Sequence, residues 1–77
     1  MTNIRVDLDV EMAKKKISLK ALSTEVGISM TNLSLLKNGK VRGIRFATLA
    51  AICEALDCQP GDLLVFEAEA EVEEQTR

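Results

Sequence analysis

The side chains of this sequence that could do chemistry are mostly cations, and they gather in its middle. Residues 12–46 hold eight lysines and arginines against one acid, Glu25. Residues 47–77 hold eight acids and one arginine, so the net charge of −2 hides two strongly opposed halves. A basic half of this kind attracts a polyanion such as nucleic acid, and an acidic half orients the domain by repelling it. For any single lysine, the alternative is simple solvation of a helix face.

Residue types that carry catalysis or bind metals are scarce. The chain contains no histidine, which is the commonest catalytic base and metal ligand. The separation of Cys53 and Cys58 fits no zinc motif, so we expect two reduced thiols that pack as small apolar side chains. No glycine-rich phosphate loop is present. We therefore expect no enzyme activity, no metal, no cofactor and no small-molecule ligand.

Length and composition predict one small globular domain. The chain has 77 residues, of which 47% are hydrophobic and 29% charged. Its apolar runs fall short of the roughly 20 residues that span a membrane. No signal-peptide pattern opens the sequence. We expect a cytoplasmic protein that does not associate with membranes.

The elements before the basic segment are a short strand and a helix. Ile4–Val6 alternates apolar and polar residues, which is typical of a strand or extended arm. Either Asp7 or Asp9 then begins a helix that runs to about Lys16, with acids in its first turn and lysines in its last. Its expected inner stripe consists of Leu8, Met12 and Ala13.

Two short helices follow, joined by a turn. Ser18 is an N-cap for a helix over residues 19–26, and Gly27 ends it. Ser29 caps a helix over residues 30–37, which ends at Asn38 and Gly39. Leucines and valine at helical spacing place both helices on one core. Residues 18–39 therefore have the pattern of a helix-turn-helix, whose second helix projects into a DNA groove.

The rest of the chain completes a small bundle. A basic loop over residues 40–44 leads to a helix over residues 46–56. Its expected inner face consists of Phe46, Leu49, Ile52, Cys53 and Leu56. Pro60 begins a brief helical turn through Leu64, and Val65–Glu67 could pair as a strand with the N-terminal arm. We expect an all-α bundle of four to five helices with short terminal strands, a domain over residues 1–67 and a disordered acidic tail over residues 68–77.

The helix-turn-helix pattern resembles the phage-repressor and Cro-like family, often called XRE. The matching residues there are Leu22, Gly27, Ser29, Leu33, Leu36 and the run Lys37-Asn38-Gly39-Lys40. Residues 44–49 and 58–64 also look like a subfamily of small bacterial single-domain regulators, so the likeness spans residues 4–66. Leu19 departs from the family, which often has a glutamine there near the DNA backbone. Ser23 replaces a usual alanine and is small enough for close helix packing.

The resemblance implies a λ-repressor-like fold and a sequence-specific DNA-binding transcriptional regulator. The helix over residues 30–37 would enter the major groove, and residues 37–45 would lie on phosphates. The expected DNA-binding residues are Ser18, Lys20, Ser29, Met30, Thr31, Asn32, Ser34, Leu35, Lys37, Asn38, Lys40, Arg42 and Arg45. Among these, Met30 and Leu35 could instead pack into the core or a dimer interface, and the polar residues could be plain solvated surface.

The expected partners are double-stranded DNA and a second copy of the chain, at least on DNA. Repression and activation are equally compatible with the sequence. The alternative function is an antitoxin-like or partner-binding protein that regulates its own operon and holds a second protein through its tail.

Overall fold

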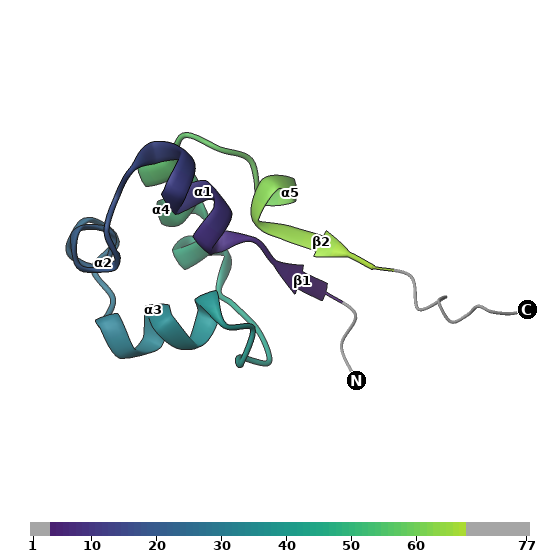
Figure 1. Cartoon of the computed structure of the whole chain (residues 1–77). Helices are drawn as coiled ribbons and strands as arrows, with labels where there is room; N and C mark the ends of the chain where they lie inside the picture. The colour runs from purple at the N-terminus through teal and green to yellow at the C-terminus, as the bar shows by residue number, and fades with distance from the viewer. Residues whose placement is uncertain (1–3, 68–77) are drawn as a thin grey trace, which may run out of the picture.

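The computed structural model describes residues 4–67, which form five helices and a two-stranded ribbon (Figure 1). The expected acidic tail, residues 68–77, lies outside the described residues, so the boundary between domain and tail stays a prediction. Within residues 4–67, no helix is long and apolar enough to cross a membrane. The mostly helical fold with short terminal strands confirms the predicted fold class.

The ribbon joins the two ends of the described chain. β1 (Ile4–Val6) pairs antiparallel with β2 (Leu64–Phe66), and the pairing sets Ile4 opposite Phe66 and Val6 opposite Leu64. The Asp7 amide continues the pairing by donating to the Leu63 carbonyl at 2.7 Å. This confirms the predicted partner of the N-terminal arm. The second strand begins one residue before the predicted bound, because the preceding helical turn ends at Leu63.

α1 (Leu8–Lys15) buries a different third residue from the one predicted. Leu8 and Met12 are buried as expected, but Ala13 is exposed and Glu11 is buried. The prediction for Ala13 was wrong because five residues after Leu8 a helix has turned to its other side, whereas Glu11 is three residues on. The Lys14 ammonium donates to the Glu11 carboxylate at 3.1 Å, which compensates its burial.

α2 (Leu19–Val26) and α3 (Met30–Lys37) have the predicted bounds because their local signals agree. Ser18 Oγ accepts from the Ala21 amide at 3.0 Å, and Ser29 Oγ accepts from the Asn32 amide at 3.1 Å. Between them Gly27 adopts a φ of +84°, which a residue with a side chain rarely takes. These caps and this glycine determine the angle at which α3 leaves α2.

α4 (Phe46–Leu56) and α5 (Pro60–Leu63) complete the core by packing against each other and against α1. α4 packs on α2 and α1 and buries Ile52 and Leu56. Phe46 was predicted on the inner face but is 85% exposed. Phe46 is the first residue of the helix, at the edge of the apolar stripe, where no other element within residues 4–67 covers it. The buried hydrophobic core consists of Leu8, Met12, Leu22, Leu33, Leu36, Ile52, Leu56 and Leu63.

Candidate nucleic-acid interface

α3 is anchored by one side and open on the other. Leu33 and Leu36 are buried against the core, with α2 and α1 as neighbours. The helix runs along the lower margin of the molecule in Figure 1, and no described element lies beyond it. A helix held in this way presents its outer face to a partner without rearranging the fold.

The outer face of α3 combines small polar and apolar side chains. Thr31, Leu35 and Asn38 lie opposite the buried leucines, and all three are exposed; Ser34, beside them, is half-buried. Leu35 is 40% exposed and Met30, on one flank, is 45% exposed. The prediction that these two might instead belong to the core is therefore excluded for this fold. Both stay candidates for base or dimer contacts.

Asn32 lies on the other flank of α3, beside the loop that leads to α4. It lines a shallow groove of about 320 Å³ together with Arg45 and Thr48. Its backbone N–H donates to Ser29 Oγ, so the side-chain carboxamide takes no part in this bond, and the residue is exposed. An exposed carboxamide of this kind can donate and accept at the same time, which suits the edge of an adenine.

The two serines predicted to contact DNA, Ser18 and Ser29, are the N-cap residues of α2 and α3. Each hydroxyl oxygen already accepts a backbone amide, at Ser18 from Ala21 and at Ser29 from Asn32. A serine hydroxyl has one donor and two acceptor positions, so its proton remains available. Each serine hydroxyl can therefore cap its helix and, at the same time, donate its proton to a phosphate oxygen.

The cations around α3 have no acidic partners among residues 4–67. The ion pairs of this region involve only Arg5 and Lys14. Five other lysines and arginines lie on or near α2, α3 and the following loop, and only one of them is as much as half-buried: Lys20, Lys37, Lys40, Arg42 and Arg45. Unpaired surface cations beside an exposed helix provide sites for phosphate groups.

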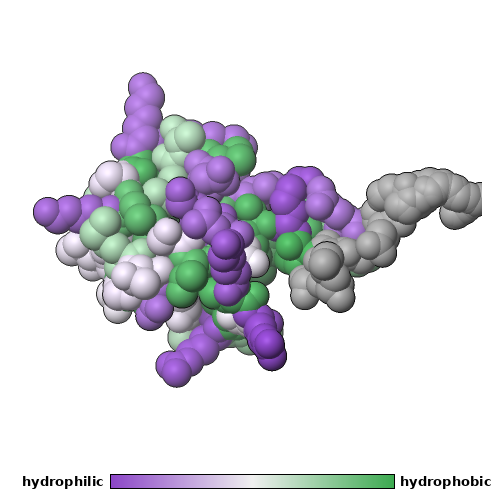
Figure 2. Space-filling view, turned by 60° about the horizontal axis from the view of Figure 1, so that its bottom comes forward, coloured by the Kyte–Doolittle hydropathy of each residue, from purple (hydrophilic) through white to green (hydrophobic). Residues whose placement is uncertain are grey.

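Figure 2 views the molecule with the α3 side turned forward. Long hydrophilic side chains project from several sides of this face and also cross its middle, among weakly polar and hydrophobic groups. This pattern agrees with an exposed helix that carries small side chains and is surrounded by lysines and arginines.

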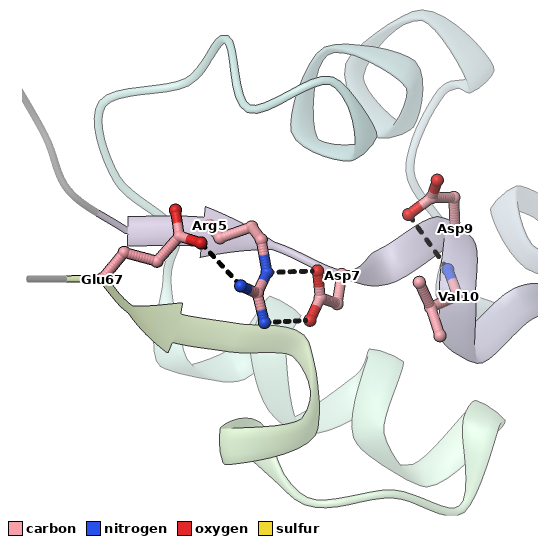
Figure 3. Close-up of polar contacts among 5 residues, drawn as sticks. All are labelled: Arg5, Asp7, Asp9, Val10 and Glu67. Atoms are coloured by element: carbon pink, nitrogen blue, oxygen red, sulfur yellow. Dashed lines mark hydrogen bonds and ion pairs between the residues drawn. The ribbon is translucent and has the colours of Figure 1, made fainter. Parts of the chain in front are cut away.

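Arg5 differs from the unpaired cations around α3, because its guanidinium is paired with two carboxylates of the same chain (Figure 3). Its guanidinium donates to Asp7 at 2.9 and 3.1 Å and to Glu67 at 2.6 Å. The bonds to Asp7 and Glu67 raise the pKa of Arg5 above its ordinary value. Arg5 therefore fastens β1 to β2 and to the start of α1, and adds little to a field that attracts DNA.

Neither cysteine belongs to the candidate interface. Cys58 follows α4, and its amide donates to the Cys53 carbonyl at 3.0 Å. Burial, and then the neighbouring Cys53, raise the pKa of the Cys58 thiol to about 11. A thiol with a raised pKa is a poor nucleophile and metal ligand at neutral pH. Within the described residues, no group of three metal-ligating side chains occurs.

Arg45, at the start of α4, was among the predicted DNA-binding residues, but the sequence analysis did not assign the backbone amides of the first turn of α4 to the interface. Arg45 occupies the N-cap position without a side-chain hydrogen bond to the helix, and Phe46 projects next to it. The sequence contains a sign of these free amides, because the residue immediately before Phe46 is Arg45 and not Ser, Thr, Asp or Asn, the side chains that cap a helix. The first amides of α4 thus remain available beside the basic loop, as a phosphate-binding helix end requires.

Comparison with known proteins agrees with this geometry. Residues 7–69 match the family model of the Cro/C1-type HTH DNA-binding domain. A relative from Bacillus subtilis (strain 168), named "Uncharacterized HTH-type transcriptional regulator YozG", is 54% identical over 66 residues. That match covers 86% of this chain and 79% of the relative.

A solved structure, the SinR protein/SinI protein complex, contains a chain that superposes with a TM-score of 0.67 at 18% identity. The superposition covers 88% of this chain and 64% of that one, so our chain spans less than two thirds of its length. At this identity the likeness concerns the fold alone. Since the family model covers most of the chain and the bacterial relative is more than half identical, the chain belongs to the Cro/C1-type helix-turn-helix family of DNA-binding transcriptional regulators.

Proposed function

We propose that this regulator recognises an operator by inserting α3 into the major groove while the surrounding cations bind phosphates. The observation that carries the proposal is the combination of a helix anchored by Leu33 and Leu36 with an outer face that no described element covers. The major groove of B-DNA admits one helix and displays a distinct pattern for each base pair. The same groove exposes phosphates on both sides, where the unpaired cations would lie.

The proposed base contacts follow from side-chain chemistry. Asn32 can form paired hydrogen bonds with adenine, and the Thr31 methyl and Met30 can contact the methyl group of thymine. Ser34 adds a hydroxyl that suits either a base edge or a phosphate, and Leu35 adds apolar contact. No arginine lies on this face, so the commonest contact to guanine is missing from α3.

The proposed phosphate contacts surround this face. They come from both serine caps, from Asn38 at the end of α3, and from the five unpaired cations: Ser18, Ser29, Asn38, Lys20, Lys37, Lys40, Arg42 and Arg45. Lys20 takes the place of the polar contact that Leu19 cannot make. Such contacts orient the protein and supply affinity without reading sequence.

We further propose that the protein acts in the cytoplasm, without catalysis, as a homodimer on DNA. Helix-turn-helix dimers bind two half-sites about 34 Å apart, one helical turn of DNA. A single copy would read only one half-site. Two copies would explain how so small a recognition surface selects an operator.

The experiment that tests the proposal compares specific and random DNA. Duplexes selected from a random pool by the purified full chain would be measured by fluorescence anisotropy beside scrambled duplexes. We expect a clear preference for the selected site, and Asn32→Ala should lose about 1–3 kcal/mol on that site and relax selection at one base pair. Equal loss on scrambled DNA would show that Asn32 contacts only the backbone.

A pair of threonines provides the matched control. Both Thr31 and Thr24 are exposed, but Thr31 lies on the outer face of α3, whereas the Thr24 hydroxyl on α2 donates to the Lys20 carbonyl at 3.0 Å. Thr31→Ala should weaken only specific binding, and Thr24→Ala should leave specificity unchanged. If both variants behave alike, α3 is not the reading helix.

A further inference from the structure

The first residue of α4 carries the most exposed of the large apolar side chains in residues 4–67. Phe46 is 85% exposed, against 69% for Phe66 and no more than 46% for the others. It belongs neither to the buried core nor to the partly buried side chains that pack against the core. Its ring therefore offers most of its apolar surface to a partner.

The charges around Phe46 indicate what kind of partner this is. Residues 37–50 contain four lysines and arginines and no acid, and none of the four forms an ion pair within residues 4–67. Such a segment attracts a polyanion and repels a basic surface. The other exposed aromatic residue has the opposite surroundings, since Glu67 follows Phe66 and pairs with Arg5 at 2.6 Å. Of the two exposed rings, only Phe46 is placed for a nucleic acid.

The start of α4 lies beside one flank of α3. The loop after α3 leads back to α4 (Figure 1), and Arg45 lines one groove together with Asn32 of α3. The major groove is about 12 Å wide, so a DNA strand runs close to each flank of a helix that enters it. The strand on the Asn32 flank would therefore pass the start of α4. Side chains on a helix lean toward its N-terminus, so the ring of Phe46 reaches past the helix end, on the side of this strand.

Deoxyribose is the part of a DNA strand that suits an apolar ring. In an intact duplex the bases are stacked on one another, so their faces are closed to a side chain that approaches from outside. The C–H groups of the sugar lie open between two phosphates. An aromatic face carries partial negative charge and its edge partial positive charge. The face therefore suits the sugar C–H groups, and the edge is compatible with a neighbouring phosphate oxygen.

We propose that Phe46 packs on a deoxyribose of the DNA strand whose phosphates Arg45 and the neighbouring cations bind. This inference rests on the proposed function, because it requires α3 in the major groove. The contact adds affinity without charge and without reading a base, which distinguishes it from the proposed contacts of both the cations and Asn32. It also gives a role to a side chain that the core does not use.

The test is fluorescence anisotropy of the full chain with a duplex that holds one half-site and with a scrambled duplex of equal length. We expect Phe46→Ser to raise the dissociation constant about fivefold on both duplexes, which is the effect of covering about half of a phenylalanine side chain. Phe46→Leu keeps an apolar side chain and should lose less. Phe66→Ser is the matched control, because it removes an exposed ring next to Glu67, and it should bind both duplexes like the unmodified chain.

The salt dependence separates a sugar contact from a phosphate contact. Phe46 has no charge, so Phe46→Ser should weaken binding by the same factor at every salt concentration. Arg45→Gln removes a proposed phosphate contact and should reduce the steepness of the salt dependence by about 0.9 in a double-logarithmic plot. A similar reduction for Phe46→Ser would show that the ring only positions Arg45, and this would overturn the sugar contact.

Three other results would also overturn the proposal. The first is unchanged affinity of Phe46→Ser for the half-site duplex. The second is a loss confined to duplexes with two half-sites, because the ring would then contact a second copy of the chain. The third is a loss matched by a lower unfolding midpoint in circular dichroism and absent from Phe46→Gln, since only stability would then have changed. If the unmodified chain binds neither duplex, the proposed function itself fails and this contact with it, whereas normal binding by both chains refutes the contact alone.

Discussion

The dependence of DNA binding on salt can be worked out from the unpaired cations. Five lysines and arginines near α3 have no acidic partner in the described part of the chain. If each neutralises one phosphate, the logarithm of the association constant falls with the logarithm of salt at a slope of about −4.5 per copy. A rise from about 50 to about 200 mM salt would then weaken half-site binding by about 500-fold.

Removing one of these charges gives a defined change. Lys40→Gln leaves four cations and a slope of about −3.6, so the same rise in salt would weaken binding by only about 150-fold. Fluorescence anisotropy with a labelled half-site duplex, titrated at four or more salt concentrations, measures both slopes. Because phosphate contacts carry no sequence information, the change should be the same on scrambled DNA.

Lys14 supplies the control for this charge removal. Its ammonium lies 3.1 Å from the Glu11 carboxylate on α1, so its charge is already compensated. Lys14→Gln keeps a donor for Glu11 and should leave the slope unchanged. A slope near zero for the unmodified chain would refute the assignment of the cations to phosphates. Equal effects of Lys14→Gln and Lys40→Gln would show that only overall charge matters.

Three further predictions concern stability and reactivity. Leu33→Ala should lower the free energy of unfolding, measured by urea titration, by about 2–5 kcal/mol because Leu33 is buried. Leu35→Ala, on the exposed side of the same helix, should change it by less than about 0.5 kcal/mol. Similar losses for the two variants would contradict the placement of α3. Gly27→Ala should cost about 1–2 kcal/mol because φ is +84°, whereas Gly43→Ala, which has equal space and no positive φ, should be nearly neutral. Since the pKa of Cys58 is raised to about 11, its reaction with a disulfide reagent at about pH 8 should be slow until urea unfolds the chain. The raised pKa also means that the stabilisation from the neutral thiol is complete below pH 9.0 and is lost as the pH rises through about 11; rapid labelling of the folded chain would contradict its burial.

The helix-turn-helix could be predicted to the residue because its signals are local. A serine N-cap bonds a backbone amide within the next three residues, and a glycine adopts a positive φ through its own backbone alone. Both signals can therefore be recognised without knowing the tertiary contacts. The bounds of α2 and α3 therefore follow from Ser18, Gly27 and Ser29 without knowledge of the core.

Features that depend on packing were harder to predict. Phe46 belongs to the apolar stripe by spacing, yet it projects into solvent because the stripe extends beyond the elements that cover α4. Glu11 is buried because its face is set by Leu8 and Met12, and residue type alone suggested the opposite. The register of β1 against β2 joins residues about 60 positions apart, and no local sequence pattern specifies it.

The candidate DNA-binding residues fall between these cases. The sequence placed most of them on or next to one helix, and the structure brings Asn32 beside Arg45 and Thr48 across a groove. It also separates Asn32, on a flank, from Thr31 and Leu35 on the outer face. Which of these contacts a base stays a prediction, because it depends on the angle of α3 in the groove of DNA.

The ribbon has a consequence for the order of events during synthesis on the ribosome. The serine caps and the glycine turn act over a few residues, so α2 and α3 can begin to form as soon as they emerge. β1 is made well before its partner β2, and the long segment between them must close into a loop at an entropic cost. Completion of the fold is therefore delayed until Leu64–Phe66 have left the exit tunnel. Until then the apolar side of β1 is exposed, which makes the nascent chain vulnerable to misassociation.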